Sequence, residues 1–431
     1  MSDCFVPAEI LLPGEGVPLD PWASIAVDQF TSQPEYWERA EARAAGKPST
    51  LHIVLPEAYL STPEEGTRLA GIRAAMEDYR KNLLTRRVNG FVYLERTQRD
   101  GTIRQGLVGL VDLDAYSYEP GDRLPIRPSE NTVVSRIPPR LKVRRGATLE
   151  SPHIMMLADD ADCILVEPVG RCKDRLPKLY DGELMLGGGH LAGWAVEDPA
   201  LVGQISTAIA ALGDQARFDA RWPAAAGQPP MTLAVGDGNH SLATAKAYWE
   251  ELKPTLSAAE RETHPARWCL AEVCNVHSPA IEIEPIHRVF FHTSSASVLM
   301  SLAEYTEENH IHICPAPGKA PDQSVRLVST REDAVVGMNG TTEPLTVGTV
   351  EKFAAYFLEG HDNCGVDYIH GEDAVRQMAA KGAVGLLLPP LEKADLFKGV
   401  VLGGVLPRKT FSMGHAEEKR YYNECRSLVK E

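Results

Sequence analysis

The sequence MTLAVGDGNHSLATAKAYWEEL, at residues 231–252, sets the architecture of this chain. Residues 231–235 are apolar apart from one threonine, which is typical of a buried β-strand. Beyond residue 241, apolar side chains recur with the spacing of an amphipathic helix, at Leu242, Ala245, Tyr248, Trp249 and Leu252. The segment GDGNHS, at residues 236–241, lies between them. The sequence therefore predicts a strand, a glycine-rich turn and a helix.

The turn has the composition of an anion-binding site. Glycine lets the main chain approach a ligand closely, and the free N–H groups at the start of a helix donate hydrogen bonds to phosphate oxygens. We expect four residues of the turn to bind phosphate: Gly236, Gly238, Asn239 and Ser241.

Asp237 and His240 are the titratable side chains of the turn, and we expect both to be catalytic. They can do acid–base work beside a bound phosphate, and Asp237 can also hold a metal ion. The dinucleotide pattern G-x-G-x-x-G is excluded, because its last position is Ser241 and because Asp237 would face the pyrophosphate. A structural alternative is a capped helix start in which Asp237 is an ordinary turn residue.

Two further clusters carry positive charge. Residues 133–143 are expected to form a strand, on which Arg136 and Arg140 share a face and bind phosphate through their planar guanidinium groups. A solvated edge strand guarded by charges is the alternative. Near the C-terminus, Lys409 and Thr410 offer a cation and a hydroxyl before a helix expected from about residue 415.

Other catalytic motifs are absent from the sequence. It contains neither the G-x-x-x-x-G-K-[ST] loop of P-loop nucleotidases nor a G-x-S-x-G elbow. The nearest approach to metal-ligand spacing is His310-x-His312-x-Cys314, which fits a packed strand end better than a zinc site.

Helical and strand patterns are mixed without regular βαβ alternation, which favours an α/β or α+β fold with a mixed sheet. Helices are expected at residues 34–45, 62–84, 199–212, 240–253, 349–359 and 371–381, and strands at 51–55, 91–97, 103–113, 163–169 and 383–388. We expect a catalytic region at residues 1–300, with a β-rich insertion at about 90–175, and a C-terminal α/β lobe at 301–431 that contributes to the site.

The composition limits the functional class. The net charge of −15 disfavours sequence-independent binding to nucleic acid. Eight scattered cysteines without a C-x-x-C pair predict reduced thiols, and neither an export signal nor a membrane-length apolar run is visible. We expect a cytoplasmic protein, monomeric or homodimeric, that binds no nucleic acid and no membrane.

The turn at 237–240 (DGNH), together with PIHR at 285–288 and PRKTF at 407–411, resembles a family placed in the ParB/sulfiredoxin superfamily. Some relatives there are free-serine kinases, and the sequence is most similar to the pyrophosphate-dependent L-serine kinases. The resemblance extends from about residue 22 to residue 422. It implies a discontinuous ParB/sulfiredoxin-like core.

The resemblance also implies residue roles. Asn239 stands where sulfiredoxins place their reactive cysteine, so reduction of sulfinic acids is not expected. Ser241 stands where an arginine usually lies, which leaves phosphate neutralisation to Arg136, Arg140 and Lys409. By analogy, Asp28 matches an N-terminal carboxylate that acts as the base.

These roles predict the reaction of L-serine with pyrophosphate to give O-phosphoserine and phosphate, with Mg²⁺ on the donor. Glu150, His287 and Arg288 are expected to bind the amino acid. ADP or ATP as donor, the reverse reaction and a non-catalytic ParB-like nucleotide-binding regulator are the alternatives.

Overall fold

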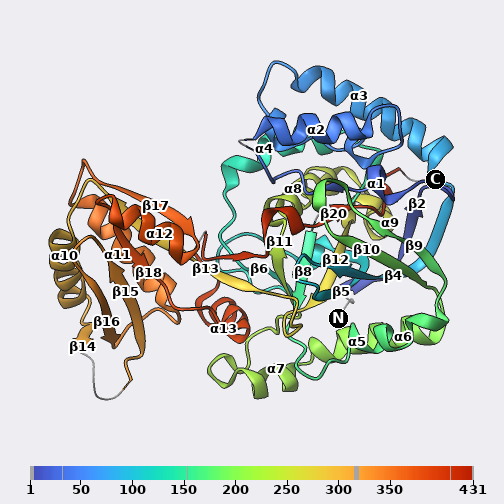
Figure 1. Cartoon of the computed structure of the whole chain (residues 1–431). Coiled ribbons are helices and arrows are strands. Elements are labelled where there is room, and N and C mark those ends of the chain that lie inside the picture. The colour runs from blue at the N-terminus through green and yellow to red at the C-terminus, as the bar shows by residue number, and fades with distance from the viewer. Residues whose placement is uncertain (1–3, 32, 153, 315–319, 408, 430–431) are drawn as a thin grey trace. The chain divides into compact units, whose positions relative to one another are not determined.

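The computed structural model describes residues 4–31, 33–152, 154–314, 320–407 and 409–429. The chain divides into two compact units (Figure 1). The first comprises residues 1–281 and 414–431, and the second comprises residues 282–413. The sequence predicted one boundary at residue 300, whereas the observed second unit begins at residue 282 and ends at residue 413. The residues from 414 onward belong to the first unit.

A mixed sheet forms the centre of the first unit. Its described strands run in the order β6-β11-β8-β12-β5-β4-β10-β9, with β1 beside β5 and β2 beside β4. The β6–β11 and β8–β12 pairs are parallel and the others are antiparallel. The bounds are β1 (Phe5–Val6), β2 (Ala8–Leu12), β4 (Arg86–Thr97), β5 (Ile103–Asp112), β6 (Ile126–Pro128), β8 (Ile154–Ala158), β9 (Lys178–Glu183), β10 (His190–Val196), β11 (Leu233–Asp237) and β12 (Trp268–Asn275).

Residues 90–175 do not stand apart from this sheet as an insertion. They supply most of β4 and all of β5, β6 and β8. Of these strands, β6 and β8 pair with β11, and β5 and β8 pair with β12. The expected α/β class with a mixed sheet is therefore confirmed, while the strands of the expected insertion are part of one sheet.

Both faces of the sheet are buried. Phe91 and Tyr93 of β4 belong to one core cluster, whereas Val92 and Leu94 belong to another, as alternation along a strand requires. The first core includes side chains of α6 (Pro199–Leu212) and α8 (Asn239–Leu252), and the second includes side chains of α2 (Pro34–Ala44) and α3 (Glu65–Asp78). The remaining helices of this unit are α1 (Leu19–Trp22), α4 (Ile137–Arg144), α5 (Glu167–Arg171), α7 (Gln215–Arg221) and α9 (Ala258–Thr263).

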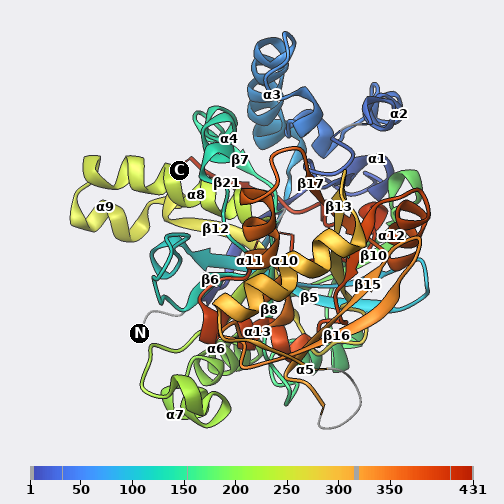
Figure 2. The ribbon, with the colours of Figure 1, turned by 90° about the vertical axis from the view of Figure 1, so that its left-hand side faces the viewer.

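The second unit has its own sheet, with the described strands in the order β14-β16-β15-β18-β13-β17 and β19 beside β13. Helices α10 and α11 pack side by side (Figure 2). The bounds are β13 (Ile283–Phe291), α10 (Ser295–Glu308), β14 (His312–Cys314), β15 (Gln323–Val328), β16 (Asp333–Asn339), α11 (Thr346–Glu359), β17 (Gly365–His370), α12 (Glu372–Ala380), β18 (Val384–Leu387), α13 (Lys393–Gly403) and β19 (Phe411–Met413).

The C-terminal segment is extended, and the helix expected from about residue 415 was wrong. Its short strands β20 (Tyr421–Tyr422) and β21 (Arg426–Ser427) pair with β3 (Ser24–Ile25) and β7 (Leu149–Glu150). Tyr421 and Cys425 are buried in the core shared by α2 and α3. Tertiary burial and strand pairing thus override the local helical pattern.

Two other expected strands were wrong. Residues 51–55 contain a 3₁₀ turn (Thr50–His52), and residues 163–169 lead into α5. The eight cysteines are unbridged. Among the described residues, no helix is both long enough and apolar enough to cross a bilayer.

Candidate functional site

The predicted strand, turn and helix are confirmed. β11 pairs with β8 through a register shift between Val235 and Asp237, and Gly238 follows with a left-handed φ of 79°. Glycine is favoured there because an L side chain in this conformation clashes with its own backbone. Asp237 accepts a hydrogen bond from the N–H of Gly238 at 2.9 Å, and α8 begins at Asn239.

The start of α8 presents main-chain donors. The N–H groups of Ser241 and Leu242 both bond to the carbonyl of Gly238, at 2.9 and 3.0 Å. The preceding amides, of Asn239 and His240, lie in the first turn, where a helix provides no acceptor of its own. These amides can bind an anion with the support of the helix dipole. The side-chain oxygen of Asn239, an acceptor, is buried and has no hydrogen-bond partner in the described part of the chain, so it would suit a donor group of a ligand and not the anion itself.

His240 is held as a neutral imidazole. Its Nε2 accepts a hydrogen bond from the N–H of Val133 at 3.2 Å. Burial lowers the pKa of His240 to about 4, and the charges of Arg140 and Arg136 add to the effect, while Asp28 opposes it. The structure therefore brings Asp28 and both arginines close to the turn. Since Nε2 is an acceptor, the proton resides on Nδ1, which remains a donor.

The arginines lie on a helix, so the expected strand at residues 133–143 was wrong. α4 has prolines in its first turn, where the missing N–H is tolerated. Ile137 and Leu141 of α4 pack against Ala243 of α8, which fixes α4 beside the turn. Arg140 donates to the carbonyl of Arg136 at 2.6 Å and forms an ion pair with Glu57. Arg136, by contrast, is exposed at the N-terminal end of α4.

Lys419 is a site residue that the sequence analysis missed. Its Nζ lies 3.4 Å from Oδ2 of Asp237, and the two side chains are only 14% and 19% exposed. The C-terminal segment, whose expected helix does not form, carries Lys419 to the turn. No local pattern marked this lysine, since its role depends on the return of the chain to the first unit.

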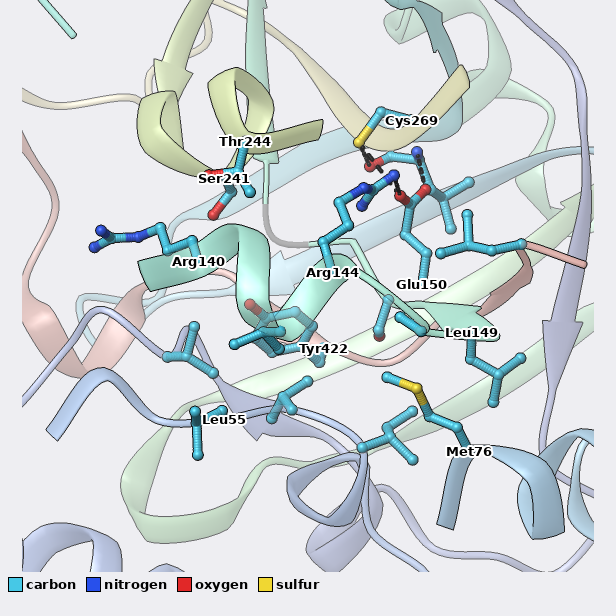
Figure 3. Close-up of a pocket in the computed structure, with 18 of the residues that line it drawn as sticks. Leu55, Met76, Arg140, Arg144, Leu149, Glu150, Ser241, Thr244, Cys269 and Tyr422 are labelled. Carbon is cyan, nitrogen blue, oxygen red and sulfur yellow. Dashed lines mark hydrogen bonds and ion pairs between the residues drawn. The ribbon is translucent and has the colours of Figure 1, made fainter. Parts of the chain in front are cut away.

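A pocket of about 160 Å³ opens beside the first turns of α8. Figure 3 shows Arg140, Ser241 and Thr244 on one side, and apolar side chains such as Leu55 and Met76 on the opposite wall. Two predicted phosphate-binding residues, Arg140 and Ser241, thus line the same cavity as Glu150.

Glu150 is occupied by protein partners. Its carboxylate lies 2.5 Å from Arg144 (Figure 3). It also lies 3.2 Å from Arg426 and accepts the N–H of Leu270 at 2.7 Å. Burial alone would raise the pKa of Glu150, but the charges of Arg144 and Arg426 lower it overall. This arrangement favours a structural role in the pocket wall over the expected contact with an amino-acid ammonium group.

Four predicted site residues belong to the second unit. Buried Arg288 forms an ion pair with Glu351 at 2.9 Å and donates to the carbonyl of Lys409. His287 accepts the N–H of Leu388 at 3.1 Å, and burial lowers its pKa to about 4. Lys409 and Thr410 directly precede β19, and the Thr410 hydroxyl donates to the carbonyl of Pro407 at 2.6 Å. These polar groups therefore have partners within the second unit.

A resident metal cage is not found in the described ranges, where no group of three His, Cys, Asp or Glu side chains could hold an ion. Asp237 can provide a single carboxylate. That number suits Mg²⁺, which is commonly held by one or two carboxylates together with substrate phosphates.

Comparison with known proteins gave distant likenesses. A search of curated proteins found no match. A free serine kinase in complex with AMP aligns with 11% identity and a TM-score of 0.37, over 74% of this chain and 91% of that chain. SbnI with a C-terminal truncation, from Staphylococcus aureus, aligns with 12% identity and a TM-score of 0.35, over 71% of this chain and 82% of that chain. A conserved hypothetical protein from Pyrococcus furiosus aligns with 9% identity and a TM-score of 0.33, over 74% of this chain and 93% of that chain.

Similarity at this level does not establish a shared activity. The family comparison is stronger, because the model described as "Protein of unknown function (DUF1015)" matches residues 11–363. This chain belongs to the DUF1015 family.

Proposed function

We propose that this protein is a small-molecule phosphotransferase that converts L-serine to O-phosphoserine with pyrophosphate as donor. One observation carries the proposal. At the turn, the first amides of α8 lie beside the carboxylate of Asp237 and the ammonium group of Lys419. Such a combination can grip a phosphate, neutralise it and move a proton, which is what phosphoryl transfer asks of a protein.

In the proposed reaction, the hydroxyl oxygen of serine attacks one phosphorus of pyrophosphate. The bond from that phosphorus to the bridging oxygen breaks, and inorganic phosphate leaves with the bonding electrons. The hydroxyl proton passes to Asp28 or to Asp237. Meanwhile the amides of Asn239 and His240 hold the phosphoryl group, and the neutral imidazole of His240 donates from Nδ1.

Several cations are available to neutralise the donor. Lys419 and the exposed Arg136 lie at the turn, while Arg140 already has Glu57 as a partner. Lys409 and Thr410 remain proposed phosphate-binding residues, and His287 a proposed serine-binding residue. Arg288, paired with Glu351, is better suited to supporting the second unit.

We further propose that Mg²⁺ accompanies the donor and that Asp237 is its protein ligand. When bound, the ion would neutralise phosphate charge. Lys419 shares the carboxylate of Asp237, so the donor's own oxygens would provide most of the coordination. EDTA is expected to abolish turnover, and excess Mg²⁺ to restore it.

The choice of pyrophosphate follows from the resemblance to pyrophosphate-dependent serine kinases in the ParB/sulfiredoxin superfamily. ADP or ATP as donor, or consumption of phosphoserine, would use the same groups. A nucleotide-binding regulator without activity is the competing function.

The decisive assay incubates the full chain with labelled serine, Mg²⁺ and each donor separately, and then separates phosphoserine from serine. Product with pyrophosphate alone supports the proposal, whereas product with a nucleotide alone corrects the donor. Tight nucleotide binding without product from any donor would establish the regulator. The reverse reaction is tested with phosphoserine and inorganic phosphate.

A further inference from the structure

Arg96, on β4, is a buried cation that lacks hydrogen-bond partners. Its side chain is fully buried, and none of its three guanidinium nitrogens has a partner among the described residues. The ring of Tyr421 lies over the guanidinium, 4.9 Å from its central carbon. A cation–π contact gives the guanidinium N–H groups no oxygen or nitrogen acceptor.

The neighbours of Arg96 increase the positive charge. Arg104 lies directly opposite on β5, in the same register pair, and Arg420 approaches from the C-terminal segment. Both are at least 95% buried. Like charges placed directly opposite each other across two strands are destabilising. The fold therefore concentrates three arginines where a core would normally place apolar side chains.

The carboxylates of this cluster already serve the other two arginines. Glu272 lies 3.5 Å from Arg104 and 2.9 Å from Arg420, and Glu424 lies 3.3 Å from Arg420. Arg104 and Arg420 thus share the two carboxylates, and Arg96 forms no ion pair with either of them in the described structure. Burial lowers the pKa of Arg96 to about 9, and the charges of Arg104 and Arg420 add to the effect, while the charge of Glu272 opposes it. Arg96 is still protonated at neutral pH.

The backbone is adapted to this arrangement. A β-carbon on Gly106 would lie 2.3 Å from Oε1 of Glu272, so only glycine allows that carboxylate to lie over β5. The preceding residue of the C-terminal segment, Lys419, pairs with Asp237, while Arg420 pairs with Glu272. The cluster is therefore joined to the phosphate-binding turn through two consecutive residues.

We propose that Arg96, with Arg104 and Arg420, forms a binding site for a small oxyanion, either a carboxylate or a phosphate group. The bound anion provides the negative charge that the cluster lacks and accepts the in-plane N–H groups of Arg96. An unpaired charge in the interior is unfavourable, whereas a planar guanidinium binds carboxylate or phosphate through two parallel hydrogen bonds. This inference does not depend on catalysis, and binding alone tests it.

The experiment measures the melting temperature of the full chain against increasing phosphate, pyrophosphate, acetate or serine, at constant ionic strength set with sodium chloride. We expect a saturable rise of several degrees with at least one oxyanion. Arg96→Met should lose this response and should be no less stable than the wild type without oxyanion. Arg87→Met is the control, because Arg87 lies on the same strand but is 48% exposed and paired with Glu9; its response should match the wild type.

The anion whose effect on the melting temperature saturates at the lowest concentration identifies the chemical group that the site binds. Serine or acetate indicates a carboxylate subsite, and phosphate or pyrophosphate indicates a phosphate subsite. If Arg96→Met does not fold, Arg96→Lys replaces it, with the half-saturating concentration expected to rise at least tenfold. The proposal would be overturned if oxyanions raised the melting temperature of the wild type no more than sodium chloride does. It would also be overturned if the melting temperature of the Arg96 variant rose with oxyanion as much as that of the wild type.

Discussion

The ammonium group of Lys419 lies 3.4 Å from the carboxylate of Asp237 at the start of α8. The two residues come from distant parts of the chain, and the C-terminal segment brings them together. A cation and a carboxylate beside main-chain donors can both bind a phosphate and move a proton. The first two predictions test this pair.

Replacing Asp237 with asparagine should lower turnover at least 100-fold, because the amide keeps the shape of the side chain but cannot accept a proton. The melting temperature should change by no more than a few degrees. Initial rates of phosphoserine formation measure the first effect and thermal unfolding the second. Asp122→Asn, at an exposed position, is the matched control. Full activity in Asp237→Asn would refute its catalytic assignment.

Lys419→Met should raise the KM for the phosphoryl donor about tenfold or more, because the turn loses the ammonium group that lies 3.4 Å from Asp237. Lys419→Arg should recover part of the affinity, since the charge is kept. The exposed Lys47→Met serves as control. Both KM and kcat are measured in the assay for phosphoserine. An unchanged KM for the donor would show that Lys419 only balances the charge of Asp237.

Glu150→Gln should destabilise the first unit by roughly 3–5 kcal/mol, because Arg144 and Arg426 would lose a buried partner. Urea unfolding followed by fluorescence measures the loss, with the exposed Glu35→Gln as control. An unchanged stability with a raised KM for serine would instead assign Glu150 to the substrate ammonium group.

The pH dependence of stability should reflect His240. Its pKa of about 4 in the folded protein lies below the ordinary value near 6.5, so the unfolded chain binds a proton more readily. The associated stability is present above pH 6.5 and is lost as the pH falls toward 4. His240→Gln should flatten this part of the profile, measured by thermal unfolding from pH 7 to 4. The pKa of His287 is also lowered to about 4, so His287→Gln measures the part of the pH dependence that comes from the second unit.

Gly238→Ala should destabilise the protein by about 1–2 kcal/mol, because a side chain is strained at a φ of 79°. Gly203→Ala is the control and should not destabilise the protein, because a β-carbon at this position meets nothing within 4 Å and alanine has a higher helix propensity than glycine in α6. Chemical denaturation measures both. Equal effects of the two substitutions would contradict the left-handed turn.

Local patterns predicted many of the elements. The helices at 34–45, 349–359 and 371–381 and the strand at 383–388 are observed as α2, α11, α12 and β18, with small shifts at their ends. The strand, turn and helix around residue 238 formed as expected. Periodicity and glycine placement act within a few residues, so they can be recognised without knowledge of the tertiary fold.

Errors arose where local signals were ambiguous. A strand was expected at residues 133–143, but Pro138 and Pro139 occupy the first turn of α4. Residues from 415 onward were expected to form a helix, yet they pair with β3 and β7. In both regions, packing against distant segments determined the conformation.

The amino-acid order alone specified a glycine turn that can receive an anion, because left-handed backbone and free helix amides are local properties. It did not reveal that Lys419 and Arg420 return to the first unit, or that Glu150 is held by two arginines. Those relationships depend on long-range strand pairing and burial, which no short sequence pattern encodes.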